Sequence, residues 1–359
     1  MTQTVMDARQ RLLNPRQRLL NEWQHGFPLC PQPYAQLARA TGLTEAEVMR
    51  TLGHALADGR VSRIGGVFAP GAGGAAVLAA MAVPQQRIEA VAARVSAHPG
   101  VNHNYLREHR LNLWFVLTGA DQGAVESGVA ALEAACGQPA LCLPLVCAYH
   151  VDLGFDLRGG VGAAPQPVPA RAAAIAPIPA GQAPLARLAE AGLAIIERPY
   201  AAWADALGWR EEQVLQCLQD WLDAGQLKRF GVVVRHHELG FAANAMVVFD
   251  VPDAAVDARG QALARLPGVT LAYRRARAAG WPYNLYAMVH GARRAAAQAV
   301  IERATSEAGL APYPREVLFS TRRFKQTGAR RFRGWDDAAD VASAGSIGPQ
   351  QETSDALAR

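Results

Sequence analysis

The feature that most restricts the fold of this chain is an internal duplication. Residues 99–117 read PGVNHNYLREHRLNLWFVL, and residues 267–289 read PGVTLAYRRARAAGWPYNLYAMV. Both segments begin with Pro-Gly-Val, continue through a Tyr-x-Arg pair and end in an Asn-Leu-aromatic sequence. The period is roughly 170 residues, far above the 20 to 50 residues of a solenoid repeat, so the duplication predicts two tandem domains.

The two halves also match outside this segment. The Tyr-x-Arg pairs are Tyr105 with Arg107 and Tyr273 with Arg275. A chain of 359 residues is long enough for each half to bury a core of its own. Other matched positions are Pro33 and Pro199, Gly59 and Gly225, Arg63 and Arg229, and Gly65 and Gly231.

Each half opens with a predicted helix-turn-helix unit. Asn14-Pro15 is typical of a helix start, and Thr44 with Glu47 forms a capping box before an apolar stripe. In the first half we expect helices near residues 11–22, 34–40 and 44–58 and a strand over 61–68. In the second half we expect helices over 185–197, 200–207 and 211–223 and a strand over 229–234.

The rest of each half predicts the element order βαββαβ, first over residues 75–151 and then over 244–324. This order is typical of a ferredoxin-like sandwich, in which two helices cover one face of an antiparallel sheet. The predicted fold class is therefore α+β, with two tandem copies of a helix-turn-helix followed by a ferredoxin-like domain. The predicted divisions are helix-turn-helix domains at 1–68 and 185–234, ferredoxin-like domains at 69–158 and 235–335, an Ala/Pro/Gly linker at 159–184 and a disordered tail at 336–359.

Composition favours a cytoplasmic protein. The longest apolar run, residues 75–83, is too short to cross a bilayer, which takes about 20 residues. The N-terminus has no apolar segment typical of a signal peptide. The five cysteines show no CxxC spacing, which indicates reduced thiols and no metal site.

The helix-turn-helix units raise the alternative of a DNA-binding regulator. A DNA-reading helix needs basic and polar side chains that meet phosphates and base edges. The candidate helix over 44–58 carries Glu45, Glu47 and Asp58 against Arg50, and the helix over 210–223 is more acidic still. The net charge of +5 also falls short of a dense basic stripe. We therefore interpret both units as packing modules and do not expect DNA as a partner.

Three segments together resemble one enzyme family. A helix-turn-helix followed by βαββαβ is similar to the Lrp/AsnC regulators. Residues 103–115, 227–249 and 283–291 resemble the siroheme decarboxylases of haem d1 biosynthesis and of the alternative haem route. The resemblance to the fused two-half form covers essentially the whole chain, and it implies that the two sheet domains pair as an intramolecular pseudo-dimer.

The resemblance also implies an activity. It is the removal of the C12 and C18 acetate carboxylates of siroheme, which gives 12,18-didecarboxysiroheme. No organic cofactor is implied, because the iron belongs to the substrate. Homologous subunits of the NirG and NirH type are possible partners, and no membrane is involved.

A siroheme site needs guanidinium groups for the eight carboxylates of its ligand and apolar walls for the flat macrocycle. The duplicated motifs and their surroundings supply both kinds of side chain. The candidate substrate-binding residues are Tyr105, Arg107, Trp114, Arg229, Arg235, His236, His237, Tyr273, Arg275 and Tyr283.

Decarboxylation of a pyrrole acetate leaves electron density that a proton must quench, so an acid that titrates near neutrality is needed. His103 and His109 flank the first Tyr-x-Arg pair, and we expect them to act as catalytic proton donors or to position a carboxylate. The second half has Leu271 and approximately Arg277 at the matching places.

The histidines of the two halves are thus complementary, because His236 and His237 have no counterpart in the first half. Such a pattern fits one productive site beside a decayed one, or one site lined from both halves. Any of the four could instead ligate the siroheme iron, and a tetrapyrrole carrier or sensor without catalysis is a third reading. The histidines that we interpret as structural are His25, His54, His98, His150 and His290.

Overall fold

The structure is a computed structural model that describes residues 14–151, 175–235 and 243–335. None of the helices in these ranges is long and apolar enough to cross a membrane. The elements of the first half are α2 (Pro15–Asn21), η1 (Glu22–Gln24), α3 (Pro33–Thr41), α4 (Glu45–Ala57), β1 (Val61–Phe68), β2 (Ala75–Met81), η2 (Gln85–Arg87), α5 (Ile88–Ala97), β3 (Val101–Arg107), β4 (Leu113–Gly119), α6 (Gln122–Cys136) and β5 (Ala140–Val151). Those of the second half are η3 (Ala180–Gln182), α7 (Ala183–Ala191), α8 (Pro199–Leu207), α9 (Glu211–Asp223), β6 (Leu227–Val234), β7 (Ala243–Phe249), α10 (Val256–Ala264), β8 (Val269–Arg275), β9 (Leu285–Gly291), α11 (Arg294–Glu307) and β10 (Arg315–Gln326).

Local sequence signals account for where several helices begin. The side chain of Asn14 accepts a hydrogen bond from the backbone N–H of Gln17 at 2.9 Å and so caps α2. Thr44 and Glu47 form the predicted capping box of α4, because each side chain accepts a hydrogen bond from the other residue's backbone N–H. Two predicted boundaries are wrong. The helix predicted over 185–197 stops at Ala191, where Gly192 adopts a φ of 122° and ends α7. The predicted linker at 159–184 ends too late, because η3 begins at Ala180 and α7 at Ala183.

The sheets of the two halves join into one closed barrel with the strand order β10-β3-β4-β2-β5-β8-β9-β7. Within each half the order is that of a ferredoxin-like sheet, which confirms the predicted fold class. The halves are then linked by two antiparallel pairings, β10 with β3 and β5 with β8. The last strand of each half therefore belongs to both sheets, which abolishes the free edges.

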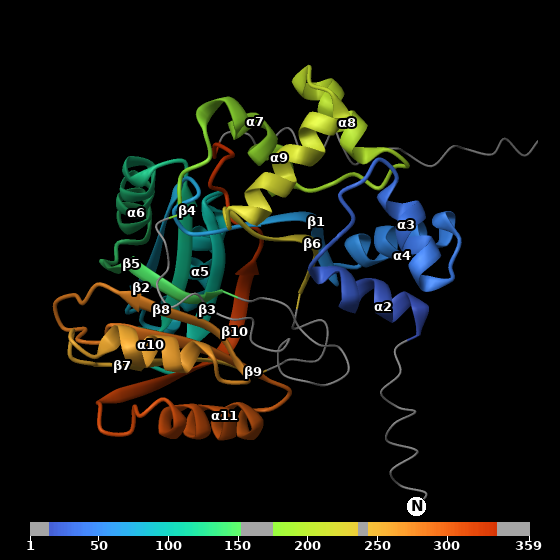
Figure 1. The fold of residues 1–359 in the computed structure, drawn as a ribbon. Coiled ribbons are helices and arrows are strands. Elements are labelled where there is room, and N and C mark those ends of the chain that lie inside the picture. The colour runs from blue at the N-terminus through green and yellow to red at the C-terminus, as the bar shows by residue number, and fades with distance from the viewer. Residues whose placement is uncertain (1–13, 152–174, 236–242, 336–359) are drawn as a thin grey trace, which may run out of the picture.

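Helices cover the outside of this barrel (Figure 1). Helices α5 and α6 pack on the first half's strands through a core that includes Val91, Phe115 and Leu132. Helices α10 and α11 pack on the second half's strands. A separate apolar cluster of inward-facing side chains, among them Trp114 and Leu318, fills the interior of the barrel.

The two helix-turn-helix units share a single hydrophobic core. Their contact is reciprocal: the hydroxyl of Tyr34 donates to the carbonyl of Ala194 at 2.7 Å, and the hydroxyl of Tyr200 donates to the carbonyl of Pro28 at 2.9 Å. Strands β1 and β6 pair antiparallel into a ribbon. Figure 1 shows this ribbon between the helices and the barrel.

A pseudo-twofold axis passes through the middle of the ribbon, where Gly65 pairs with its duplicate Gly231. Both positions need glycine. A Cβ atom at Gly65 would lie 2.6 Å from the carbonyl oxygen of Ala189, and one at Gly231 would lie 2.4 Å from that of Trp23. The close approach of helix and ribbon is therefore built in the same way on both sides of the axis.

Candidate functional site

The described residues enclose a cavity of about 320 Å³ between the β1–β6 ribbon and the interior of the barrel. Side chains alternate along a strand, so residues two positions apart share one face. His103, Tyr105 and Arg107 of β3 therefore all face the cavity, and so do Tyr273 and Arg275 of β8. Both copies of the duplicated motif line one space.

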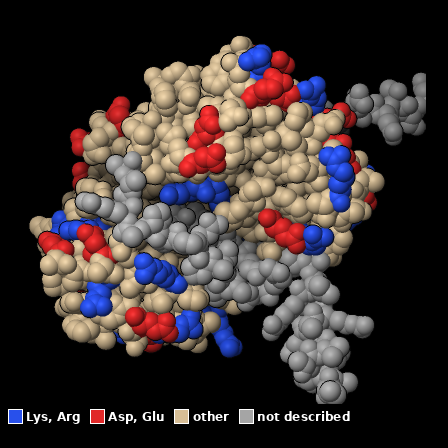
Figure 2. Space-filling model, viewed as in Figure 1, with Lys and Arg blue, Asp and Glu red and all other residues tan. Residues whose placement is uncertain are grey.

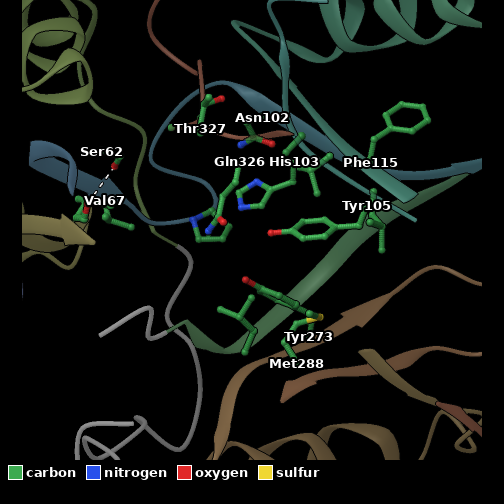
Figure 3. A pocket seen from close by; sticks show the side chains of 18 of the residues that line it. Ser62, Val67, Asn102, His103, Tyr105, Phe115, Tyr273, Met288, Gln326 and Thr327 are labelled. Atoms are coloured by element: carbon green, nitrogen blue, oxygen red, sulfur yellow. Dashed lines mark hydrogen bonds between the residues drawn. The ribbon is translucent and has the colours of Figure 1, made fainter. Parts of the chain in front are cut away.

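The two motifs have nearly the same geometry. The guanidinium carbon of Arg107 lies 5.5 Å from the centre of the Tyr105 ring, and that of Arg275 lies 5.4 Å from the centre of the Tyr273 ring. Figure 3 shows the hydroxyl groups of both tyrosines directed into the space below His103. Burial raises the pKa of Tyr105 to about 12, so its hydroxyl stays protonated at neutral pH.

Each of these arginines also ties its strand to the other half. Nη1 of Arg107 donates to the carbonyl of Leu318 on β10 at 2.9 Å, and Nη1 of Arg275 donates to the carbonyl of Leu143 on β5 at 2.8 Å. The Nε atoms of both arginines are buried and have no hydrogen-bond partner among the described residues. A buried N–H without a partner is costly, and an anionic ligand would satisfy it.

Guanidinium groups dominate the charge of the cavity. A single carboxylate, that of Glu190, belongs to the described residues that line it. Burial lowers the pKa of Arg63 and of Arg107 to about 10, which leaves both protonated at neutral pH. Such an excess of buried positive charge favours a ligand with several negative groups. The six arginines of the lining are Arg63, Arg107, Arg229, Arg235, Arg275 and Arg331.

The carboxylate of Glu190 is fully engaged by the segment after β10. It accepts hydrogen bonds from the backbone N–H groups of Arg331 at 2.7 Å, Phe332 at 3.4 Å and Arg333 at 3.3 Å. Nε of Arg333 adds a further bond at 3.2 Å. This anchoring places Arg331 in the cavity wall, and burial lowers the pKa of its guanidinium.

Aromatic packing fixes the same segment on its other side. Phe332 lies 4.6 Å from Phe68, measured between ring centres, and the indole N–H of Trp335 donates to the carbonyl of Thr118 at 3.0 Å. A Cβ atom at Gly73 would lie 2.4 Å from the Phe332 ring, so the glycine-rich turn before β2 makes room for this side chain. The segment is thus part of the folded core.

His103 is the histidine that faces the open space of the cavity (Figure 3). Its ring stacks on Tyr105 at 6.2 Å between ring centres. Burial, with a smaller contribution from Arg107, lowers the pKa of His103 to about 4. With this pKa the imidazole is neutral at physiological pH.

A second histidine reaches the cavity wall, although its sequence context indicated only a structural role. Nε2 of His290 lies 3.0 Å from Nδ2 of Asn244, and its Nδ1 lies 2.9 Å from Oγ1 of Thr270. Oδ1 of Asn244 in turn accepts a hydrogen bond from Nη2 of Arg107 at 3.2 Å. Both ring nitrogens of His290 are thus engaged by the protein, in a chain of contacts that ends on Arg107.

The structure separates His109 and Tyr283 from the other predicted site residues. Nε2 of His109 lies 2.9 Å from a carboxylate oxygen of Glu316, and the Tyr283 hydroxyl donates to the other oxygen at 3.0 Å. Neither residue lines the cavity. The reason is that β3 ends at Arg107, so His109 lies in the following turn and leaves the alternation that directs His103 inward.

The remaining predicted residues divide into two groups. Trp114, Arg229 and Arg235 line the cavity as expected. His236 and His237 lie outside the described residues.

Sequence reasoning missed Arg63 and Arg331 as site residues. The duplication contained the signal for Arg63, because this residue matches Arg229. No comparable signal exists for Arg331, whose position depends on Glu190, a residue 141 positions away in the chain.

Comparison with protein families identifies both kinds of domain twice. Residues 72–149 and 238–325 match the model of the AsnC-like ligand binding domain. Residues 16–61 and 185–227 match the model of the siroheme decarboxylase NirDL-like HTH domain.

Individual proteins agree with the family models. The siroheme decarboxylase NirDL subunit of Paracoccus denitrificans is 43% identical over 308 residues, which cover 86% of this chain and 94% of that protein. The siroheme decarboxylase of Hydrogenobacter thermophilus is 30% identical over 310 residues, which cover 86% and 92%. A crystal structure of the siroheme decarboxylase NirDL in complex with an iron-uroporphyrin III analogue superposes with a TM-score of 0.62 at 26% identity, covering 92% of this chain and 98% of that one.

Proposed function

Since the chain belongs to the siroheme decarboxylases of the NirDL type, we propose that the cavity between ribbon and barrel is where it binds siroheme and removes its C12 and C18 acetate carboxylates. The observation that carries this proposal is the charge of the lining, six arginines against one engaged carboxylate. Siroheme is a polycarboxylate on a flat apolar ring, and it would satisfy these guanidinium groups. Trp114, Val116 and Met288 supply apolar wall beside them.

His103 is the proton donor in this proposal. The bond between the acetate methylene carbon and its carboxyl carbon breaks, carbon dioxide leaves, and the electron pair on the methylene carbon takes a proton from the imidazolium. The acetate thereby becomes a methyl group and His103 becomes neutral. Tyr105 and Tyr273 face the same space and would orient the carboxylate through their hydroxyl groups.

For His103 to act as proton donor, substrate binding must raise its pKa enough to protonate the imidazole. The low pKa of His103 results from burial and from Arg107. The carboxylates of a bound siroheme would surround the ring with negative charge and raise that pKa. We expect binding at neutral pH to be accompanied by proton uptake, which calorimetry in buffers of different ionisation enthalpy measures.

The contacts of His109 support a role in the packing of the β3–β4 turn against β10 through Glu316. We propose no separate cofactor, since the substrate contains the iron, and we place the reaction in the cytoplasm. Related NirD, NirL and NirG subunits exist as separate proteins. Whether this fused chain needs such a partner is decided by its activity when purified alone.

The surface does not favour the DNA-binding alternative. Helices α4 and α9 both have two acidic residues in their first turns. Among the described residues on the face drawn in Figure 2, basic and acidic groups are interspersed and form no broad basic surface. A polyanion such as duplex DNA requires the opposite arrangement.

The test is anaerobic incubation of the purified protein with siroheme, followed by mass spectrometry of the extracted tetrapyrrole. The wild type should release two carbon dioxide molecules per siroheme. His103→Ala should bind siroheme without converting it, and His54→Ala, which alters an exposed histidine of α4, should retain full activity. Tight binding without any change of mass in the wild type would overturn the proposal in favour of a carrier or sensor.

A further inference from the structure

Resting on this function, we propose that both acetate carboxylates leave at one place, beside His103, in two separate binding events. Between these events the singly decarboxylated intermediate leaves the cavity, rotates by half a turn and binds again in the opposite orientation. The number of working sites is thereby fixed at one, although the chain contains two copies of the motif.

The first observation is that the two motifs share one cavity. Tyr105 and Tyr273 both line it, and Figure 3 shows them directed into the same space. The pseudo-twofold axis between the halves runs through the Gly65–Gly231 pair of the ribbon that borders the cavity. The two copies are therefore two sides of one binding space.

The second observation is that four of the six arginines of the cavity form a cationic frame that is duplicated across this axis. Arg63 and Arg229 are matched positions on the ribbon, and Arg107 and Arg275 are matched positions on the barrel. A polycarboxylate that is turned by half a revolution about the axis would meet these four guanidinium groups in either orientation. The frame therefore accepts either of two orientations.

The third observation is that the acid is not duplicated among the residues that the structure describes. Leu271 lines the cavity at the place that corresponds to His103. His290 does not replace it, because both of its ring nitrogens are held by Asn244 and Thr270. Among the described residues, one side of the binding space can therefore donate a proton from an imidazolium, and the other side presents an aliphatic chain at the matching place.

The substrate matches this asymmetry. A half-turn of the macrocycle about the line through its meso carbons C5 and C15 exchanges C12 with C18. Each acetate can therefore reach His103 in one of the two orientations that the arginine frame accepts. Each decarboxylation also consumes one proton, so His103 must be protonated again from solvent before the second. Departure of the intermediate allows both the turn and the reprotonation.

The experiment is a partition measurement on the wild-type protein. Siroheme is supplied in large excess, and the reaction is stopped at early times. Tetrapyrroles in the filtrate are separated from those on the protein, and each species is identified and quantified by mass spectrometry. We expect singly decarboxylated siroheme to form most of the early product in the filtrate, and doubly decarboxylated product to appear after a lag that lengthens with excess siroheme. Early product that is doubly decarboxylated, without a free intermediate, would overturn the proposal.

Two variants sharpen the result. His103→Ala should lose both decarboxylations, and a variant that still removes one carboxylate would show that a second acid exists. The exchange variant His103→Leu/Leu271→His places the imidazole on the other side of the pseudo-twofold axis. We expect its decarboxylation rate to be at least tenfold higher than that of His103→Leu alone. Failure of the wild type to release any carbon dioxide would instead count against the proposed function itself.

Discussion

The backbone N–H of Arg331 donates to a carboxylate oxygen of Glu190 at 2.7 Å, which joins the segment after the last strand to helix α7. This contact, rather than any local preference, sets where the Arg331 guanidinium lies. Glu190 is a deeply buried carboxylate among the described residues, with 2% of its surface exposed. Its removal should therefore affect both stability and substrate binding.

We expect Glu190→Ala to lower the free energy of unfolding by about 1–3 kcal/mol, because it leaves several backbone donors and Arg333 without their acceptor. The affinity for siroheme should fall as well, since Arg331 loses its anchor. Urea unfolding and a siroheme titration measure the two effects. Glu190→Gln, which keeps one acceptor oxygen, should fall between the wild type and Glu190→Ala. An unchanged affinity in Glu190→Ala would remove Arg331 from the proposed binding set.

Arg331→Ala should weaken siroheme binding with little effect on the chemical step. A hydrogen bond to a charged group contributes about 1.5–3 kcal/mol, which corresponds to roughly a 10- to 150-fold rise in Kd. Absorbance titration gives Kd, and single-turnover kinetics with saturating protein give the rate of decarboxylation. Arg50→Ala is the matched control, because Arg50 is an exposed arginine of α4. A large loss of the single-turnover rate at saturation would show that Arg331 acts in the reaction itself.

The buried imidazole of His103 should make the protein less stable in acid. Its pKa is about 4 in the folded state, against an ordinary value of 6.5. Between these two pH values the unfolded chain binds more protons, so the free energy of unfolding falls as the pH decreases. His103→Leu, which copies Leu271 of the other half, should flatten this dependence. Some slope should remain, because burial and Lys325 also lower the pKa of His98. Parallel stability curves for the two proteins would contradict the assignment.

Asn244→Ala should act through Arg107. It removes the acceptor for Nη2 of Arg107 and the partner of His290 Nε2, while the bond from Arg107 to the Leu318 carbonyl remains. We expect a loss of about 1–3 kcal/mol of stability and a higher KM for siroheme. Thr270→Val breaks the far end of the same chain of contacts without touching Arg107, so its KM should stay close to that of the wild type. Equal KM values for both variants would argue for a general loss of packing.

The duplication made much of this site predictable. It aligned Tyr105 with Tyr273 and Arg107 with Arg275, and strand alternation directs all four into one space. The same alternation explains why His103 faces the cavity. The alternation does not extend to His109, because β3 ends at Arg107 and His109 lies in the turn that follows.

Other parts of the site depend on contacts that no local pattern encodes. The pairing of β3 with β10 joins residues more than two hundred positions apart, such as Tyr105 and Arg323. It decides that the sheets close into a barrel with one interior. Glu190 and Arg331 meet only because of this closure and the docking of the helix-turn-helix units above it.

The covalent linkage of the two halves has a consequence for how the cavity can change over generations. In a homodimer, every substitution would appear on both sides of the axis, so a new histidine would arrive as a pair and a lost one would vanish twice. Here codons 103 and 271 mutate independently. The chain can therefore keep a symmetric binding frame and specialise its two walls one residue at a time.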